Sequence, residues 1–343
     1  MAQRSFFGEM FRKAIFSFTK TLFIGIGIIA IFIGISFLLH TPEKMHYATP
    51  VVQPNHTWTQ KPLNSKVPTI VEVAINGPIG LSELTHEDVR NQLLATIEDE
   101  ISIDQVKALL LRIDSPGGTV TDSDGIYNLI KRYKEKYNMP VWAFIDGFCA
   151  SGAMYIACAA DKVFATNASI IGSVGVIVGP IFNFADLMEG VGVKAKTITA
   201  GKSKDELNPF RPWKKDEGVI IQTITDAHYE NFINIVSSNR AKLSKEFLLE
   251  HGAHIYPADK ALEHGYIDVI NNSRDDVLYE LVTSLNIESD YQVVMMDTKN
   301  WVKTIFNNQN ALFSGKIQHT VDMGNCPSKF RGQFLYLYSP EMK

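Results

Sequence analysis

The sequence is poor in cysteine and carries no large excess of charge. Its 343 residues include three cysteines, Cys149, Cys158 and Cys326, an odd number without the spacing of metal ligands. This argues against a disulfide framework and against a cysteine-based metal site. The formal net charge of -4 and the lack of a basic stripe argue against a nucleic-acid partner. The sequence also lacks internal repeats and low-complexity blocks, so it is typical of a globular protein.

One long apolar run is present near the beginning, from Thr21 to Leu39, and it contains no charged residue. A helix over this run is about 28 Å long, close to the roughly 30 Å hydrocarbon core of a membrane. No small-residue cleavage site follows it, which favours an uncleaved anchor over a signal peptide. Basic residues dominate before the run: Arg4, Arg12, Lys13 and Lys20. The positive-inside rule therefore predicts a cytoplasmic N-terminus and a remainder outside the cytoplasm.

Apart from this anchor, the chain divides by pattern into four parts. Residues 1–20 precede the anchor at 21–39, and the polar residues 40–66 form a predicted linker. Residues 67–275 alternate between apolar runs and helical patterns, which predicts an α/β domain with largely parallel strands. Residues 276–343 form a C-terminal extension without readable chemistry, in which Trp301–Phe313 resembles a helix.

Within the α/β domain, the hydrophobic periodicity predicts individual strands and helices. The predicted strands are Thr69–Ile75, Val106–Ile113, Val141–Ile145, Lys162–Ala165, Ile170–Val178 and Ala195–Ala200. The predicted helices are Glu87–Glu100, Asp122–Tyr137, Ser151–Ala160, residues 214–245 and residues 258–264.

Two glycine-rich turns follow predicted strands and open predicted helices. The first reads Asp-Ser-Pro-Gly-Gly over 114–118, and the second reads Asp-Gly-Phe-Cys-Ala-Ser-Gly-Ala over 146–153. Ser151 is thereby placed where a strand ends and a helix begins, among small residues. The amides of Gly117 and Gly118 offer donors for an anion. A hydroxyl with backbone N–H groups nearby is the minimum equipment for acyl transfer.

A histidine base for Ser151 is not evident, because the histidines of the C-terminal half are not in turns that would reach it. Lysine is the other option: Lys202 and Lys204 follow the predicted strand Ala195–Ala200. An ordinary lysine, with a pKa of about 10.4, is protonated at neutral pH. Desolvation among apolar groups lowers such a value enough to supply a free amine.

Each of these residues also has a purely structural interpretation. Ser151 is suited to a helix cap, and Lys202 and Lys204 are suited to a solvated loop. Ser173 lies between glycines and fits a turn. Gly117 and Gly118 fit positions with positive φ.

The chain resembles the signal peptide peptidase A family of serine proteases, most closely its short, single-domain members. The resemblance spans about residues 67–275 and rests on five motifs in order. These are Asp-Ser-Pro-Gly-Gly at 114–118, Ala-Ser-Gly-Ala-Met-Tyr at 150–155, Ile-Gly-Ser-Val-Gly-Val at 171–176, Gly-Lys-Ser-Lys-Asp at 201–205 and the closing segment at 255–268.

The resemblance implies a ClpP/crotonase-like domain of repeated β-β-α units and a serine–lysine dyad. Ser151 matches the nucleophile and Lys204 the base, whereas Lys202 is two residues out of register. Ser173 matches a serine that positions the lysine, and Gly117 and Gly118 match the oxyanion turn. Phe148 and Cys149, ahead of Ala150, depart from the family pattern.

The sequence therefore predicts a membrane-anchored serine endopeptidase of the bacterial inner membrane that needs no metal or cofactor. The resemblance implies substrates such as remnant signal peptides or other membrane-proximal polypeptides, and assembly into a homo-oligomer. Two alternatives remain: a crotonase-type acyl-CoA enzyme that uses the same amide pair, and a proteolytically inactive membrane scaffold. The acyl-CoA alternative explains neither the anchor nor Ser151 and Lys204.

Overall fold

The computed structural model describes residues 16–20, 22–23, 25–31, 48–80, 84–98, 101–271, 273–287, 290–297 and 335–337. The chain divides into two units, Met1–His46 and Tyr47–Lys343. The predicted anchor residues 32–39 and the predicted helix Trp301–Phe313 lie outside the described residues, as does Cys326. The helices that are described include none with the length and apolar character needed to cross a membrane.

The described residues of the first unit are helical, and their large apolar side chains are exposed to solvent. Those with at least half of their surface exposed are Phe16, Phe18, Leu22, Phe23, Ile26, Ile28, Ile29 and Ile31.

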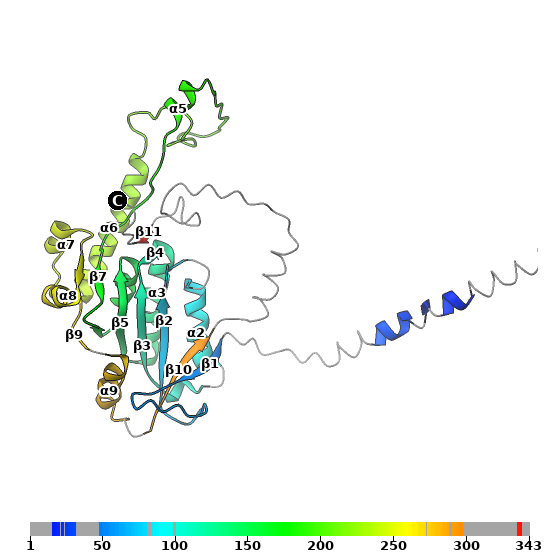
Figure 1. Ribbon diagram of the computed structural model, residues 1–343, viewed down its shortest axis with the longest axis vertical. Helices are drawn as coiled ribbons and strands as arrows, with labels where there is room; N and C mark the ends of the chain where they lie inside the picture. The colour runs from blue at the N-terminus through cyan, green and yellow to red at the C-terminus, as the bar shows by residue number, and fades with distance from the viewer. Residues whose placement is uncertain are drawn as a thin grey trace, which may run out of the picture. The chain divides into compact units, whose positions relative to one another are not determined.

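The second unit is built on a mostly parallel sheet (Figure 1). Its described strands follow the order β1-β10-β2-β3-β5-β6-β9, with β7 paired to β5 and β8 paired to β7. Their bounds are β1 Thr49–Gln53, β2 Thr69–Asn76, β3 Val106–Ser115, β5 Val141–Ala150, β6 Lys162–Ala165, β7 Ile170–Gly172, β8 Ile255–Pro257, β9 Val269–Ile270 and β10 Gln292–Asp297. Among the described strand pairs of this sheet, β1–β10 and β7–β8 are antiparallel and the others are parallel. The predicted α/β class with largely parallel strands is confirmed.

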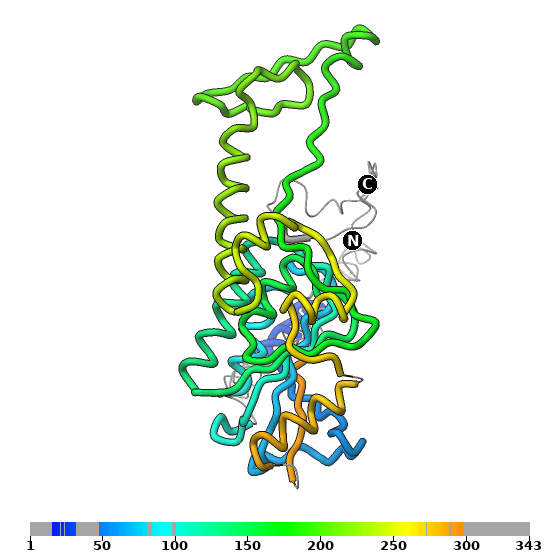
Figure 2. Tube along the Cα trace, turned by 90° about the vertical axis from the view of Figure 1, so that its left-hand side faces the viewer, coloured from blue at the N-terminus to red at the C-terminus, as the bar shows by residue number. Residues whose placement is uncertain are grey.

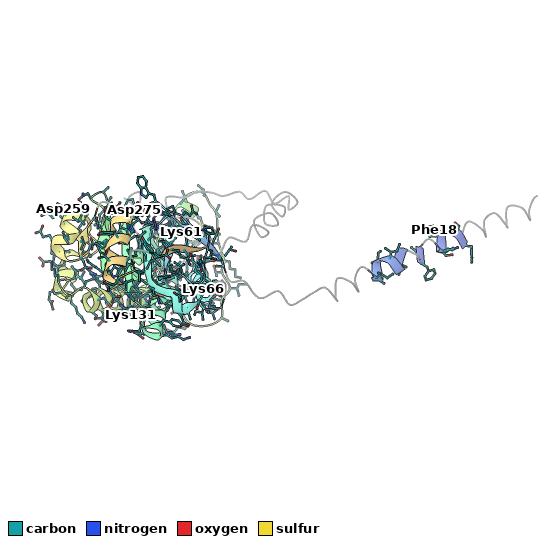
Figure 3. The ribbon with its side chains drawn as sticks, turned by 90° about the horizontal axis from the view of Figure 1, so that it is seen from below. Phe18, Lys61, Lys66, Lys131, Asp259 and Asp275 are labelled. Carbon is teal, nitrogen blue, oxygen red and sulfur yellow. The ribbon has the colours of Figure 1, made fainter. Side chains whose placement is uncertain are left out.

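The central strands are buried on both faces, as their continuous apolar runs predict. On β3, Leu109 and Leu111 enter one core cluster while Leu110 enters the other, because successive side chains of a strand point to opposite faces. Helices α2 (His86–Glu98), α3 (Val120–Tyr137) and α4 (Gly152–Ala157) contribute to the first cluster. Helix α9 (Arg274–Ser284) covers the second face through Val277 and Leu281. Charged side chains such as those of Lys61, Lys66 and Asp259 lie at the surface (Figure 3).

Segments assigned from sequence to the linker and the C-terminal extension contribute strands to this sheet. Strand β1 comes from residues 40–66 and β10 from residues 276–343, and the two pair with each other. Strand β10 also pairs in parallel with β2. Arg274, at the start of α9, donates to the buried Glu72 of β2 at 2.6 Å. Strand β10 of the extension is therefore integral to the sheet.

An arm of residues 177–224 projects from this body (Figure 2). It contains α5 (Ala185–Gly190) and the beginning of α6 (Val219–Asn239), whose later residues Phe232 and Val236 are buried against the body. The strand predicted at Ala195–Ala200 is wrong: these residues pair with no strand, and Ile198 is 87% exposed. Its alternating pattern is real, but none of the described strands pairs with it to form a sheet.

Candidate active site

Ser151 occupies a strained turn between β5 and α4. Its backbone angles are φ 56° and ψ -119°, outside the regions that suit a residue with a side chain. Its N–H donates to the carbonyl of Gly172 at 2.9 Å, and its side chain is almost fully buried. A serine held in such a turn at the end of a strand is the arrangement of a nucleophile elbow.

The helix-cap interpretation of Ser151 does not fit this geometry. Ser151 stands at the N-cap position of α4, yet its side chain makes no capping hydrogen bond. By contrast, the caps Thr119 and Ser244 each accept a hydrogen bond from a backbone N–H. Within the described part of the chain, no residue forms a hydrogen bond with the Ser151 hydroxyl, which leaves it available for chemistry.

Ser173 lies beside Ser151 because of strand register. Strands β5 and β7 are parallel, with Ala150 opposite Gly172, so that the next residue of each strand is a serine. Ser173 is also buried and has a positive φ of 55°, and its N–H donates to the carbonyl of His254 at 2.7 Å. A side chain at Gly172 would approach that same carbonyl to 2.5 Å, so glycine is required there. The structure thus brings these two serines together.

The first glycine turn forms the short strand β4 (Gly117–Thr119), which α4 contacts. Ile79 donates to the carbonyl of Gly117 at 2.9 Å and accepts from the N–H of Thr119 at 3.1 Å. The N–H of Gly117 donates to Ser115 Oγ at 3.2 Å, so it already has a partner. Of the two glycine amides selected from sequence, Gly118 is the better placed donor, because its N–H faces the edge of β4 away from Ile79, where β11 (Leu335–Leu337) pairs.

The amide of Gly152 is a second candidate donor that the sequence analysis did not single out. It follows Ser151 directly and is the first residue of α4, where N–H groups have no partner within the helix. The residue after a nucleophile commonly supplies one oxyanion donor. The strand–turn–helix pattern around Ser151 is visible in the sequence and would have been sufficient to select Gly152.

Lys204 is not brought to Ser151 within one chain. It is exposed on the arm, as is Lys202, and it forms no hydrogen bond with Ser151 or Ser173. Its neighbour Asp205 is held by Arg211 Nε at 2.9 Å, and this hydrogen bond lowers the pKa of the Asp205 carboxyl. The arm is also tied internally, since the N–H of Phe184 donates to the carbonyl of Pro209 at 2.7 Å.

The root of the arm is joined to the helix that follows Ser151. Tyr155 of α4 is fully buried, and its hydroxyl donates to Asp124 Oδ1 of α3 at 2.7 Å. Asn231 Nδ2 of α6 donates to the same hydroxyl at 2.8 Å. Tyr155 therefore links α3, α4 and α6, and so connects the frame around Ser151 to the helix that carries the arm.

One histidine and two cysteines also lie close to the two serines. The ring of His254 contacts those of His251 and Tyr256, and it forms no hydrogen bond with Ser151. Cys149 and Cys158 are buried free thiols, and burial raises the pKa of Cys158 to about 12. Across the described ranges, no group of three or more His, Cys, Asp or Glu residues is arranged to hold a metal ion.

Comparison with known proteins connects this geometry to proteases. The model of peptidase family S49 matches residues 133–288, which include Ser151, Ser173 and Lys204. A putative signal peptide peptidase SppA from Enterococcus faecium is 32% identical over 215 residues, covering 60% of this chain and 61% of that protein. A putative protease from Synechocystis sp. is 37% identical over 183 residues, covering 53% and 63%. The chain thus spans less than two thirds of each of these relatives.

Among solved structures, a ClpP1 mutant from Listeria monocytogenes aligns with 60% of this chain and 92% of its own, at 20% identity and a TM-score of 0.40. A similarity of this size carries no argument about mechanism, which has to rest on the site itself.

Proposed function

Because the chain is a member of the signal peptide peptidase A family, within peptidase family S49, we propose that it is a serine endopeptidase with Ser151 as nucleophile. The observation that carries this proposal is the strained, buried Ser151, whose hydroxyl forms no hydrogen bond with any of the residues that the structure describes. Backbone strain of this kind costs on the order of 1–3 kcal/mol and persists where function requires it.

In the proposed reaction, Lys204 is the general base. Its free amine takes the proton of Ser151 Oγ while that oxygen attacks the substrate carbonyl, and the resulting oxyanion accepts hydrogen bonds from the amides of Gly118 and Gly152. The protonated lysine then gives its proton to the departing amine. Water, deprotonated by the same lysine, hydrolyses the acyl-enzyme and releases Ser151. Ser173, beside Ser151, would hold the lysine amine in place.

The proposal is tested directly by proteolysis. The full chain, purified in detergent, should cleave an unfolded polypeptide such as denatured casein, with new N-termini detected by mass spectrometry. An acyl-CoA enzyme or an inactive scaffold of the same fold would leave the polypeptide intact, so a lack of cleavage under all conditions would contradict the proposal.

Assembly of several copies is proposed because the arm carries Lys204 away from Ser151 and exposes many apolar side chains. These are Ile177, Ile181, Phe182, Leu187, Val191, Val193, Ile198, Phe210, Trp213, Val219, Ile220 and Ile224. Many exposed apolar side chains on one segment are typical of a protein–protein contact. An arm packed against a neighbouring copy would bury these side chains and desolvate the lysine, as a neutral amine requires.

We therefore expect a soluble form that begins at Tyr47 to run well above the mass of a monomer in light scattering. Replacing Leu187 and Val191, which are 66% and 69% exposed, by aspartate should shift it toward monomer and lower peptidase activity with it. A monomer that still cleaves peptides at the wild-type rate would contradict the proposal. Tyr279→Asp, at a 54% exposed position on α9, is the control and should change neither property.

We also propose a membrane location, with the N-terminus in the cytoplasm and the protease domain outside it. Support comes from the basic residues before Thr21 and from the exposed apolar side chains of the first unit, since a membrane would remove their apolar surface from water. Substrates would then be remnant signal peptides or other membrane-proximal polypeptides.

The proposed topology is tested with reporter fusions. Alkaline phosphatase, which is active only outside the cytoplasm, should be active when fused after residue 60. Activity of a cytoplasm-dependent reporter at the same position would reverse this topology.

A further inference from the structure

The turn that carries Lys204 is held by one arginine of the arm (Figure 2). Arg211 Nε donates to the carboxylate of Asp205 at 2.9 Å, and Arg211 Nη2 donates to the backbone carbonyl of the same residue at 2.7 Å. Nη2 also pairs with Glu217 Oε1 at 2.5 Å, just before α6 begins. The Arg211 side chain is 26% exposed and that of Glu217 only 8%. These contacts tie the residue that follows Lys204 to the segment that leads into α6.

This support matters because the turn is strained. Ser203 and Leu207, on either side of Lys204, have positive φ angles of 61° and 57°, a region that residues with side chains rarely occupy. Glu217 Oε2 accepts from the N–H of Leu207 at 3.4 Å. Backbone conformations of this kind persist only where surrounding contacts determine them. Loss of the Arg211–Glu217 pair would therefore release the turn and change the position of Lys204.

Two carboxylates follow Lys204 directly, and both have other partners. Asp205 is bound by Arg211, and this hydrogen bond lowers the pKa of the Asp205 carboxyl. Glu206 Oε1 accepts from the N–H of Gly218 at 2.8 Å. A carboxylate that paired with the lysine amine would stabilise its protonated form, and a protonated amine cannot act as a base. Arg211 thus engages a group that would otherwise oppose catalysis.

The lysines of this part of the arm do not replace Arg211. The charge of Lys214, on the same segment as Arg211, also lowers the pKa of the Asp205 carboxyl. Lys202 lies on the turn itself, and Lys196 lies on the preceding segment of the arm. Within the described structure, none of these three lysines donates a hydrogen bond to Asp205, whereas Arg211 does. Removing Arg211 would therefore free the carboxylate.

We propose that Arg211 is a positioning residue for the base: it fixes the turn that carries Lys204 and keeps the Asp205 carboxylate from pairing with the lysine amine. This inference rests on the proposed function, because it concerns the lysine of the same site. Arg211 acts through Lys204 and not on the substrate. Its loss should therefore change both the rate of turnover and the pH at which the lysine becomes available.

The first test measures kcat, KM and the pH profile of kcat for the full chain in detergent. Arg211→Met should lower kcat about tenfold or more with KM little changed, because misplacing a catalytic group by 1 Å can cost about 10²-fold. It should also move the ascending limb of the profile to higher pH by about half a unit or more. Arg211→Lys keeps the charge but not the planar fork, so the limb should stay in place while kcat stays low. Arg90→Met, which removes an exposed arginine paired with Glu87 on α2, is the control and should change neither property.

A double variant assigns the pH shift to one carboxylate. In Arg211→Met, Asp205→Asn the unpaired carboxylate is gone, so the limb should return to the wild-type pH while kcat stays low. A limb that remained displaced would overturn the proposal. So would an Arg211→Met enzyme with a lower kcat and an unmoved limb, since a residue with a purely structural role would have that effect. Wild-type kcat and pH profile in Arg211→Met would overturn it as well.

A last measurement follows the lysine without catalysis. The Ser151→Ala chain and the Ser151→Ala, Arg211→Met chain are treated with fluorodinitrobenzene over a range of pH, and labelling of Lys204 is quantified by mass spectrometry. Because this reagent attacks only the neutral amine, the pH midpoint of labelling should be about half a unit or more higher in the second chain. Equal midpoints would overturn the proposal. A raised midpoint in a protein whose Lys204→Ala variant remains active would instead sustain the role of Arg211 and contradict Lys204 as the base.

Discussion

Replacing Ser151 by alanine should lower kcat by at least about 10³-fold, because loss of a serine nucleophile leaves only the contributions of oxyanion binding and substrate positioning. The free energy of unfolding should change by no more than about 0.5 kcal/mol, since the Ser151 hydroxyl does not cap α4 and forms no hydrogen bond with another described residue that the substitution would remove. Activity is measured with a fluorogenic peptide and stability by denaturant titration. Retention of more than a tenth of the wild-type rate would show that another residue is the nucleophile.

Ser244→Ala is the matched control for this substitution. Ser244 caps α7 (Lys245–His251) by accepting a hydrogen bond from the N–H of Phe247 at 3.1 Å. Its loss should cost about 1 kcal/mol of stability and leave the peptidase rate of the folded protein unchanged. The two substitutions therefore have different effects: Ser151→Ala lowers the peptidase rate, whereas Ser244→Ala lowers the stability.

Lys204→Ala should abolish nearly all turnover, and Lys204→Arg should not restore it, because a guanidinium stays protonated near neutral pH and cannot act as a base. Lys202→Ala should retain most of the activity. Both lysines are exposed on the arm, so none of these substitutions should change the melting temperature. This comparison shows which of the two lysines is the base. If Lys202→Ala were the inactive variant, the base would be Lys202 and not Lys204.

A mixture of inactive variants tests whether the lysine comes from a neighbouring copy. Ser151→Ala and Lys204→Ala chains are unfolded together, refolded and assayed. If the arm of one copy serves the Ser151 of the next, mixed assemblies contain some complete sites and regain a fraction of the wild-type activity. A mixture as inactive as its two components would place both residues of each site on one chain.

The elements that were predicted from sequence are those whose signals are local. Val106–Ser115 and Lys162–Ala165 are continuous apolar runs bounded by polar or turn residues, and the structure has strands there. Strand β5 runs five residues beyond the predicted end at Ile145, because Cys149 and Ala150 pair with β3 and β7 despite the intervening Asp146-Gly147. The pairing partners, and not the local composition, decide where this strand ends.

Elements that depend on distant partners were missed or misassigned. Strand β10 is short and apolar, and it is stabilised between β1 and β2, which come from far earlier in the chain. Ala195–Ala200 has the alternation of a strand but no partner within the chain. At the site, the motifs identified Ser151, Ser173 and the glycine turn, while the preference for Gly118 over Gly117 required the hydrogen bond to Ser115. Lys204 remains a prediction from the family motif.

The central claim is that Ser151 is a nucleophile activated by Lys204, and a fluorophosphonate probe tests it most directly. The probe is incubated with the full chain in detergent, and the labelled residue is identified by peptide mapping. We expect one labelled serine, Ser151, in the wild-type and Lys202→Ala chains, and a rate of labelling at least about 10²-fold lower in Lys204→Ala, because a general base contributes about that much or more. Labelling elsewhere, or equal labelling with and without Lys204, would contradict the account.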